Sequence, residues 1–182
     1  MRRLRQRLAQ EGGYSLVELV VTMAILGTVM GGLTTVFVAG GKAQQNLNSR
    51  FQAQSQARVA LDKLRREVHN ACTIQTQSAT SVTFLFQPTC SSNAVTWCTR
   101  ASTNFSGYAL YRVPGTTCTD GQLFADALTS DSIFTYTAQN TPAGSYALAR
   151  LHVDFTVNVE PAKAYTRYRL VDDIAFRNSP RS

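Results

Sequence analysis

The sequence predicts an α+β protein in which one long N-terminal helix packs on an antiparallel β-sheet, and three observations predict it. Residues 19–41 contain no charged side chain. Residues 42–70 have no proline and no glycine and become amphipathic toward their end. The remainder is rich in Ser, Thr, β-branched and aromatic residues, in short runs separated by turn signals, which is typical of strands. One helical region followed by a series of strands indicates the α+β class.

The uncharged run is long enough to cross a membrane. It has 23 residues, and at ~1.5 Å per residue a helix of this length spans roughly 35 Å, against ~30 Å for a hydrocarbon core. Four arginines lie within the first seven residues, and the positive-inside tendency keeps such an end in the cytoplasm. A cleaved secretory signal fits less well, because its apolar region is shorter and no Ala-x-Ala site follows. A plain uncleaved anchor is the other alternative.

One carboxylate, Glu18, lies one turn inside the apolar segment. An unpaired charge at a membrane centre costs about 2.5–3.5 kcal/mol, so this side chain either reaches the headgroup layer or meets a counter-charge.

The residues around Glu18 resemble a known export signal. Gly12-Gly13, then an aromatic residue, then Ser15-Leu16-Val17-Glu18 and an unbroken apolar helix resemble the class III signal of type IV pilins and type II secretion pseudopilins. The resemblance implies that prepilin peptidase cuts between Gly13 and Tyr14 and N-methylates Tyr14, and that Glu18 acts in filament assembly. Such a cut creates an amine four residues from Glu18, on the same helix face. Between staggered subunits, the amine of one copy would neutralise Glu18 of another and favour helix packing in one axial register, which predicts an assembly device. Two positions depart from the family pattern: Tyr14 stands where Phe is usual, and Thr35 stands where many major pilins have a kinking proline.

Periodicity and resemblance together divide the chain into four parts. Residues 1–13 are expected to form a cytoplasmic basic leader, 14–41 the transmembrane and assembly half of the helix, 42–72 an amphipathic stalk helix, and 73–182 an exported, disulfide-containing antiparallel β-domain. This is the pilin-like architecture, with a long N-terminal transmembrane and stalk helix on a sheet. The stalk residues expected to face the sheet are Leu47, Phe51, Ala57, Leu61, Leu64 and Val68.

All four cysteines lie beyond the membrane segment: Cys72, Cys90, Cys98 and Cys118. An even number outside a membrane span indicates two disulfides in an oxidising compartment. Free buried thiols and a zinc site are the alternatives, but the spacings of 18, 8 and 20 contain no Cys-x-x-Cys pair. Three pairings are open, and Cys72–Cys90 with Cys98–Cys118 is slightly preferred.

Five segments have the pattern of strands: 81–86, 95–99, 107–113, 146–160 and 165–176. The fourth alternates most strongly between apolar and polar residues, which is typical of an antiparallel strand with one buried face. Between the third and the fourth, an irregular region is expected from Asp120 through Ser132.

No catalytic, metal or cofactor site can be assembled from the sequence. His69 and His152 are interpreted as packing or surface residues, because no serine or cysteine nucleophile can be placed beside them. Asp120, Asp126 and Asp131 lie in one loop-rich stretch, but their spacing alone does not make a calcium site. We therefore expect no enzymatic activity, no cofactor, no metal and no small-molecule substrate.

The charge of the exported part leaves a nucleic-acid partner open. From Lys42 onward the chain has 14 Lys and Arg residues against 9 acids, about +5, which is consistent with weak DNA binding but also with plain solubility. Arg167 and Arg169, on one strand face with Tyr165, are candidate contacts.

The expected function is that of a structural subunit, a minor pilin or pseudopilin of a type IV pilus-like filament. Residues 61–68 and Phe176-Arg177-Asn178 resemble the minor pilin and J-type pseudopilin group. The alternatives are a piston pseudopilin of type II secretion and a DNA-binding minor pilin of a DNA-uptake system. The resemblance implies as partners other pilins or pseudopilins, prepilin peptidase and an inner-membrane assembly platform. The implied location is the inner membrane, in a single pass with a cytoplasmic N-terminus, and then an extracytoplasmic filament.

Overall fold

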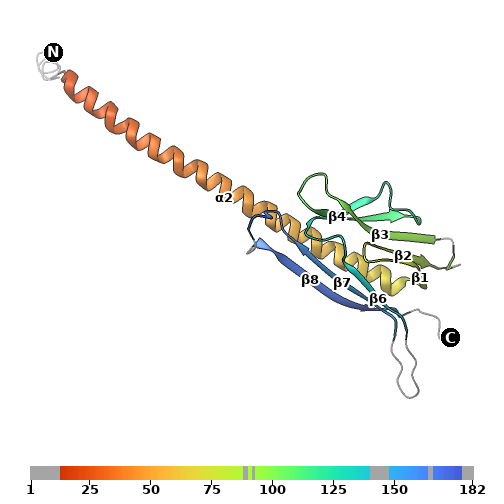
Figure 1. The fold of residues 1–182 in the computed structure, drawn as a ribbon. Helices are drawn as coiled ribbons and strands as arrows, with labels where there is room; N and C mark the ends of the chain where they lie inside the picture. The colour runs from red at the N-terminus through yellow and green to blue at the C-terminus, as the bar shows by residue number, and fades with distance from the viewer. Residues whose placement is uncertain (1–12, 88–89, 92, 140–147, 164–165, 178–182) are drawn as a thin grey trace, which may run out of the picture. The chain divides into compact units, whose positions relative to one another are not determined.

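The computed structural model describes residues 13–87, 90–91, 93–139, 148–163 and 166–177 (Figure 1). The chain divides into two compact units, Met1–Asn46 and Leu47–Ser182. Helix α2 (Leu16–Asn70) contributes to both units. The strands that follow it are β1 (Thr73–Gln77), β2 (Ser81–Phe86), β3 (Asn93–Ala101), β4 (Tyr108–Pro114), β5 (Gln122–Leu128), β6 (Phe134–Thr137), β7 (Arg150–Val157) and β8 (Tyr168–Ala175).

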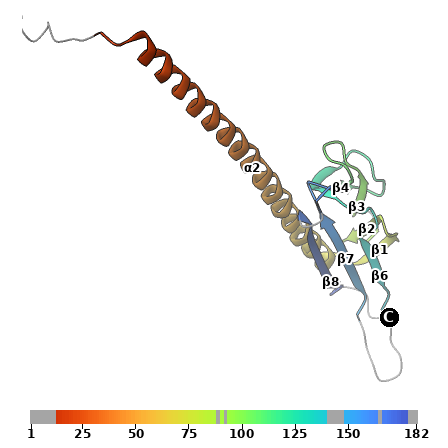
Figure 2. The ribbon, with the colours of Figure 1, turned by 60° about the vertical axis from the view of Figure 1, so that its left-hand side comes forward.

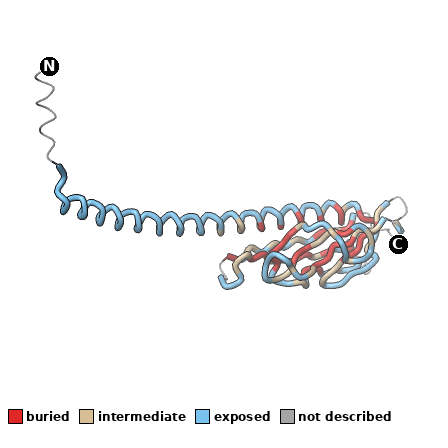
Figure 3. The backbone as a smooth tube through the Cα atoms, turned by 90° about the horizontal axis from the view of Figure 1, so that it is seen from above, coloured by how far each residue is buried: buried red, intermediate tan, exposed pale blue. Residues whose placement is uncertain are grey.

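In the second unit α2 packs on the sheet through one narrow face. Its buried apolar residues are spaced by three and four, as a single face of an α-helix requires. Small residues come first and large ones later, so the backbone approaches the sheet closely at the start of this face. The buried apolar positions of the helix are Ala53, Ala57, Ala60, Leu61, Leu64 and Val68, coloured red in Figure 3.

Two of the predicted core positions on the helix are wrong. Leu47 is 64% exposed and Phe51 is 71% exposed, whereas Ala53 is buried. At ~100° of rotation per residue, Phe51 lies about 120° around the helix from Ala57, outside the face that meets the sheet. At the start of this face the prediction chose large apolar residues, whereas the buried positions there are alanines.

Every strand pairing is antiparallel, and the sheet runs β1-β2-β3-β4-β5-β7 with both β6 and β8 beside β7 (Figure 2). Pairing between β5 and β7 is limited to Leu128 and Val157, whereas β7 pairs with β8 along its whole length. The sheet curls, because β6 also contacts the turn between β1 and β2: the amides of Ile133 and Phe134 donate to Ala79 O at 2.8 and 3.1 Å. The α+β, pilin-like fold class is confirmed.

The strand predictions succeed where the pattern is regular. Strand β2 has the predicted bounds, and β7 alternates between buried and half-buried residues along its length, with its exposed first residue Arg150 as the exception. The region expected to be irregular contains β5, whose buried Asp126 and positive φ of 59° at Ala127 interrupt the strand pattern. Strands β1 and β6 were also missed, because both are short and polar.

A buried carboxylate, Glu67, joins the helix to the sheet. Its side chain accepts hydrogen bonds of 2.7 Å from Trp97 Nε1 on β3 and from Arg112 Nε on β4. Lys63 approaches the same carboxylate at 3.4 Å from the preceding turn. Trp97 is fully buried and packs on Phe124 with ring centroids 4.9 Å apart. The helix is therefore fixed to the sheet by polar contacts inside the apolar core, and not by apolar packing alone.

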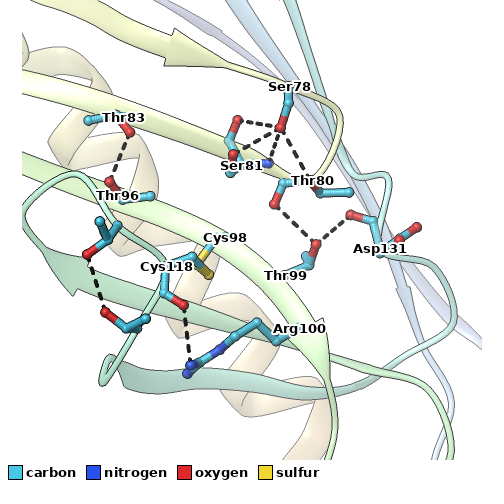
Figure 4. The surroundings of a disulfide bond; sticks show 12 residues. Ser78, Thr80, Ser81, Thr83, Thr96, Cys98, Thr99, Arg100, Cys118 and Asp131 are labelled. Atoms are coloured by element: carbon cyan, nitrogen blue, oxygen red, sulfur yellow. Dashed lines mark hydrogen bonds between the residues drawn. A yellow bond between two sulfur atoms is a disulfide. The ribbon is translucent and has the colours of Figure 1, made fainter.

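Two disulfides fix loops to the sheet: Cys72 is joined to Cys90, and Cys98 to Cys118. This is the pairing that the sequence analysis slightly preferred. Figure 4 shows Cys118 beside β3, where its carbonyl accepts a hydrogen bond of 3.4 Å from Arg100 Nη1. The loop after β4 also covers β3, because Thr96 donates to the carbonyl of Gly115 at 2.7 Å.

Replacing Cys98 and Cys118 together by serine is expected to lower the free energy of unfolding by about 3 kcal/mol, because the unfolded chain loses the constraint of a loop of some twenty residues. Thermal unfolding of the full chain in detergent, followed by circular dichroism, measures the change. Thr119→Ala, on the exposed residue next to Cys118, is the matched control and should leave the transition in place. Equal transitions for the double variant and the control would contradict the prediction.

On the face of the β7–β8 pair that carries His152 and Asp173, Arg169 binds Asp154 through two hydrogen bonds of 2.9 and 2.5 Å. These bonds, and then the positive charges of Arg169 and His152, hold the pKa of Asp154 below its ordinary value. A depressed carboxyl pKa contributes stability above the unfolded value of about 3.9, and the contribution is lost as the pH falls through the folded value. Because the pair is largely exposed, that contribution is small.

Arg169→Ala is therefore expected to raise the pKa of Asp154 toward about 3.9. An NMR titration of the side-chain carboxyl carbon measures it. Arg150→Ala, on the same face of the same strand pair, is the control and should produce a smaller shift, because no ion pair joins Arg150 to Asp154 among the described contacts. An unchanged titration in the Arg169 variant would show that the hydrogen bonds do not persist in solution.

Candidate processing and assembly site

The residues before α2 form its N-terminal cap. Gly13, Tyr14 and Ser15 are not helical, and the carbonyl of Ser15 accepts hydrogen bonds from the amides of Glu18 at 2.9 Å and Leu19 at 3.1 Å. Ser15 is therefore the cap residue, and Glu18 stands three positions later, in the spacing of a capping box. A carboxylate in the first turn is also favourable near the positive end of the helix dipole. Sequence reasoning missed this second role of Glu18, although the Ser-x-x-Glu spacing signals it.

Glu18 has no ion-pair partner among the described residues. It is exposed, and the side chains around it on α2 are apolar and exposed as well. The exposed large apolar residues within two turns of it are Tyr14, Leu16, Val17, Leu19, Val20, Val21, Met23 and Ile25. A carboxylate in such surroundings lacks a counter-charge within its own helix, so a charge from elsewhere is needed once this surface leaves water.

The hydroxyl groups in the apolar segment are satisfied within the helix itself. Thr22, Thr28 and Thr35 each donate to the carbonyl three residues earlier, at 2.7–2.9 Å. Thr34 donates to the carbonyls of both Met30 and Gly31 at 2.9 Å. Bonds of this kind remove the cost of placing a hydroxyl in an apolar medium. Within the apolar segment, Glu18 is left as the side chain whose polarity the helix does not neutralise.

The peptide bond between Gly13 and Tyr14 is accessible to an enzyme. Tyr14 is 84% exposed, and apart from the chain neighbours no atom of the described residues lies within 4 Å of the point where a Cβ on Gly13 would stand. Directly after it, α2 is long and apolar enough to cross a membrane by length and composition, with a window of mean hydropathy 2.0. The Gly13–Tyr14 bond is therefore accessible at the entry of an apolar helix.

The other candidate residues do not form a site. Asp126 is buried, and it accepts a hydrogen bond of 3.1 Å from Asn104, whereas the carboxylate of Asp131 accepts one from Ser132. His152 lies 2.9 Å from Asp173. Among the residues that the structure describes, no group of three His, Cys, Asp or Glu side chains could hold a metal ion.

The two arginines suggested as nucleic-acid contacts differ in their surroundings. Arg169 is held by Asp154, while Arg167 is exposed. Tyr165 and Asn178 lie outside the described residues, so the suggested Arg/Tyr patch and the terminal subgroup match stay predictions.

Comparison with curated proteins and with solved structures finds no match to the chain. Comparison with protein-family models finds one: residues 8–34 match the prokaryotic N-terminal methylation motif. The matched residues include Gly13, Tyr14 and Glu18 and the first turns of α2, which are the features described above. An apolar N-terminal helix of this kind anchors pilins in the membrane. The chain therefore carries the N-terminal methylation signal of type IV pilins and pseudopilins.

Proposed function

We propose that this protein is a non-enzymatic structural subunit, a minor pilin or pseudopilin, of a type IV pilus-like filament. Prepilin peptidase removes residues 1–13 in the inner membrane and methylates the amine of Tyr14. The mature chain then leaves the membrane through an assembly platform and joins neighbouring subunits by its apolar helix. The observation that carries the proposal is Glu18: a carboxylate one turn into an apolar helix, next to an accessible Gly13–Tyr14 bond, within the methylation motif.

The proposed interaction is a pairing of unlike charges between subunits. Cleavage turns the amide of Tyr14 into a cationic amine, so each subunit then has one positive and one negative group near the start of α2. In the intact chain the nitrogen of Tyr14 belongs to an amide and carries no charge. Where these helices pack together out of water, the amine of one subunit can neutralise Glu18 of another, which fixes their axial offset. Processing is thus a precondition of assembly.

N-terminal sequencing and intact-mass measurement test the proposal. In membranes that contain prepilin peptidase, the chain is expected to begin at N-methylated Tyr14, and without the peptidase at Met1. Gly13→Leu should block cleavage, because a Cβ at this position meets no described atom beyond its chain neighbours within 4 Å, so we expect the added side chain to act mainly on the enzyme. Gly31→Ala, inside α2 and equally open, is the control and should be cut normally. Retention of Met1 beside an active peptidase, or a cut beyond Gly40, would overturn the proposal.

The DNA-uptake alternative has its own test. An electrophoretic shift with the full chain in detergent should show binding that weakens steeply with salt if arginines contact phosphates. Arg167→Ala should reduce it, with Arg169→Ala as the matched control, because Asp154 already holds Arg169. Absent or salt-insensitive binding would exclude this role and leave the structural role intact.

A further inference from the structure

In the second unit, the face of α2 that points away from the sheet carries exposed apolar residues. Phe51 is 71% exposed and Val59 is 58% exposed. At ~100° of rotation per residue, Val59 lies about 160° around the helix from the buried Ala57, almost opposite the sheet. Single exposed apolar residues are common on protein surfaces. These two belong to one row of side chains spaced by four residues, with Ser55 between them, so they form a continuous feature of the helix surface.

This row borders a groove of about 260 Å³ on the surface of α2. Six residues line the groove in two rows, each spaced by four: Phe51, Ser55 and Val59 in one, and Gln54, Arg58 and Asp62 in the other. Helices pack when a ridge of side chains spaced by four on one helix enters a groove between two such ridges on another. The groove on α2 therefore has the form that receives a second helix.

The two charged residues that line the groove already have partners. Arg58 donates to the hydroxyl of Tyr168 at 2.9 Å, and the carboxylate of Asp62 lies 3.1 Å from Arg65. Arg50, the charged residue that precedes them in the helix, forms an ion pair within the same unit. A charged occupant would need a counter-charge once water is excluded from the groove, whereas an apolar one needs none. The groove thus fits an uncharged, apolar helix.

We propose that this groove receives the uncharged N-terminal helix of a neighbouring filament subunit. The inference rests on the proposed function, which brings such helices together outside the membrane. The chain itself shows the matching half, since residues 19–41 carry no charge. Within that half, an unbroken row of exposed large apolar residues spaced by four forms a ridge: Val21, Ile25, Val29, Leu33 and Phe37. A ridge of this kind is what a groove between two such rows accepts.

The groove requires a different neighbour from the one that pairs with Glu18. Subunits that leave the same membrane in the same orientation have parallel helices, and the charge pair offsets two of them by four residues, about 6 Å. At that offset Phe51 faces the stalk of the neighbour and not its apolar half. Phe51 reaches the level of the neighbour's Phe37 only at an offset of about fourteen residues, roughly 21 Å. Each subunit therefore contacts two neighbours at different heights.

Photo-crosslinking in sheared filaments tests the contact. A benzophenone amino acid at Phe51 of the full chain is expected to bond, on irradiation, to the apolar N-terminal segment of another subunit, as mapped by mass spectrometry of the digested adduct. The same probe at Val171, exposed on β8, is the control and should not reach that segment. An adduct to any other segment, or no adduct from a subunit present in the filaments, would overturn the inference and leave the proposed function intact. A chain that never enters filaments would overturn both.

Substitutions in the groove make the test independent of the crosslinker. Phe51→Ala should lower the amount of this subunit in sheared filaments about tenfold, because a large apolar side chain no longer fills the contact. Ser55→Asp should lower it at least as much, because it places an unpaired charge there. Thr119→Asp, on an exposed loop residue, is the control and should change nothing. The melting temperature, the membrane level and the mature N-terminus should stay unchanged in all three. Normal incorporation of either groove variant would contradict the inference.

Discussion

Replacing Glu67 by alanine is expected to lower the free energy of unfolding of the second unit by about 3–5 kcal/mol, the range found when one partner of a buried ion pair is removed. The side chain of Glu67 is 8% exposed, and its removal leaves Arg112, whose side chain is 24% exposed, without its carboxylate. It also leaves Trp97 Nε1 without an acceptor in the core. Because Arg112 retains some contact with solvent, we expect a result near the lower end of the range.

Two further variants separate charge from hydrogen bonding at this site. Glu67→Gln keeps an acceptor for Trp97 but removes the negative charge, so its effect should lie between those of the unaltered chain and Glu67→Ala. Lys63→Ala removes a contact of 3.4 Å from a half-exposed side chain and should cost less than about 1 kcal/mol. Thermal unfolding followed by far-ultraviolet circular dichroism measures all three. An alanine variant no less stable than Lys63→Ala would mean that packing alone fixes the helix to the sheet.

The structural role of Glu67 cannot be predicted from the residues next to it in the sequence. On the helix, an acid four residues after Lys63 has the pattern of an ordinary surface ion pair. Its partners Trp97 and Arg112 are 30 and 45 residues away, and they become its neighbours only because β3 and β4 lie beneath α2. The exposure of Phe51 has the same origin, since the choice of helix face depends on where the sheet begins.

Features that depend only on residues adjacent in the sequence could be predicted from it. The alternation of β7 requires only that one face of the strand is buried, and it predicts which residues are buried. The motif around Gly13 and Glu18 lies within one helical turn and its cap, so no distant contact is needed to recognise it. Strand β5 was not predicted, for the opposite reason. Asp126 is tolerated in the strand because its carboxylate accepts hydrogen bonds from Asn104 and from the amide of Ala127, and the sequence does not show these contacts.

Glu18→Gln is expected to lower the amount of this subunit recovered in sheared filaments by at least about tenfold. The substitution leaves a neighbouring amine without a counter-charge in an apolar surrounding, which costs about 2.5–3.5 kcal/mol, and each 1.4 kcal/mol is a factor of about ten. Quantitative immunoblotting of sheared material against total membrane protein measures it. The membrane level and the mature N-terminus should stay unchanged, which separates failed assembly from failed processing.

A displaced carboxylate tests whether register matters as well as charge. Combining Glu18→Gln with Thr22→Glu moves the acid four residues along the helix, about 6 Å. Incorporation should stay low, because the amine of the neighbour then faces the wrong turn. Thr22→Val is the matched control for the second site and should incorporate normally, since among the described contacts the hydroxyl of Thr22 bonds to the carbonyl of Leu19 in its own helix. Full recovery in the double variant would show that any acid in this region suffices. Unchanged incorporation of Glu18→Gln itself would remove the charge pair from the assembly mechanism, because a subunit without the carboxylate would then pack as well as one that has it.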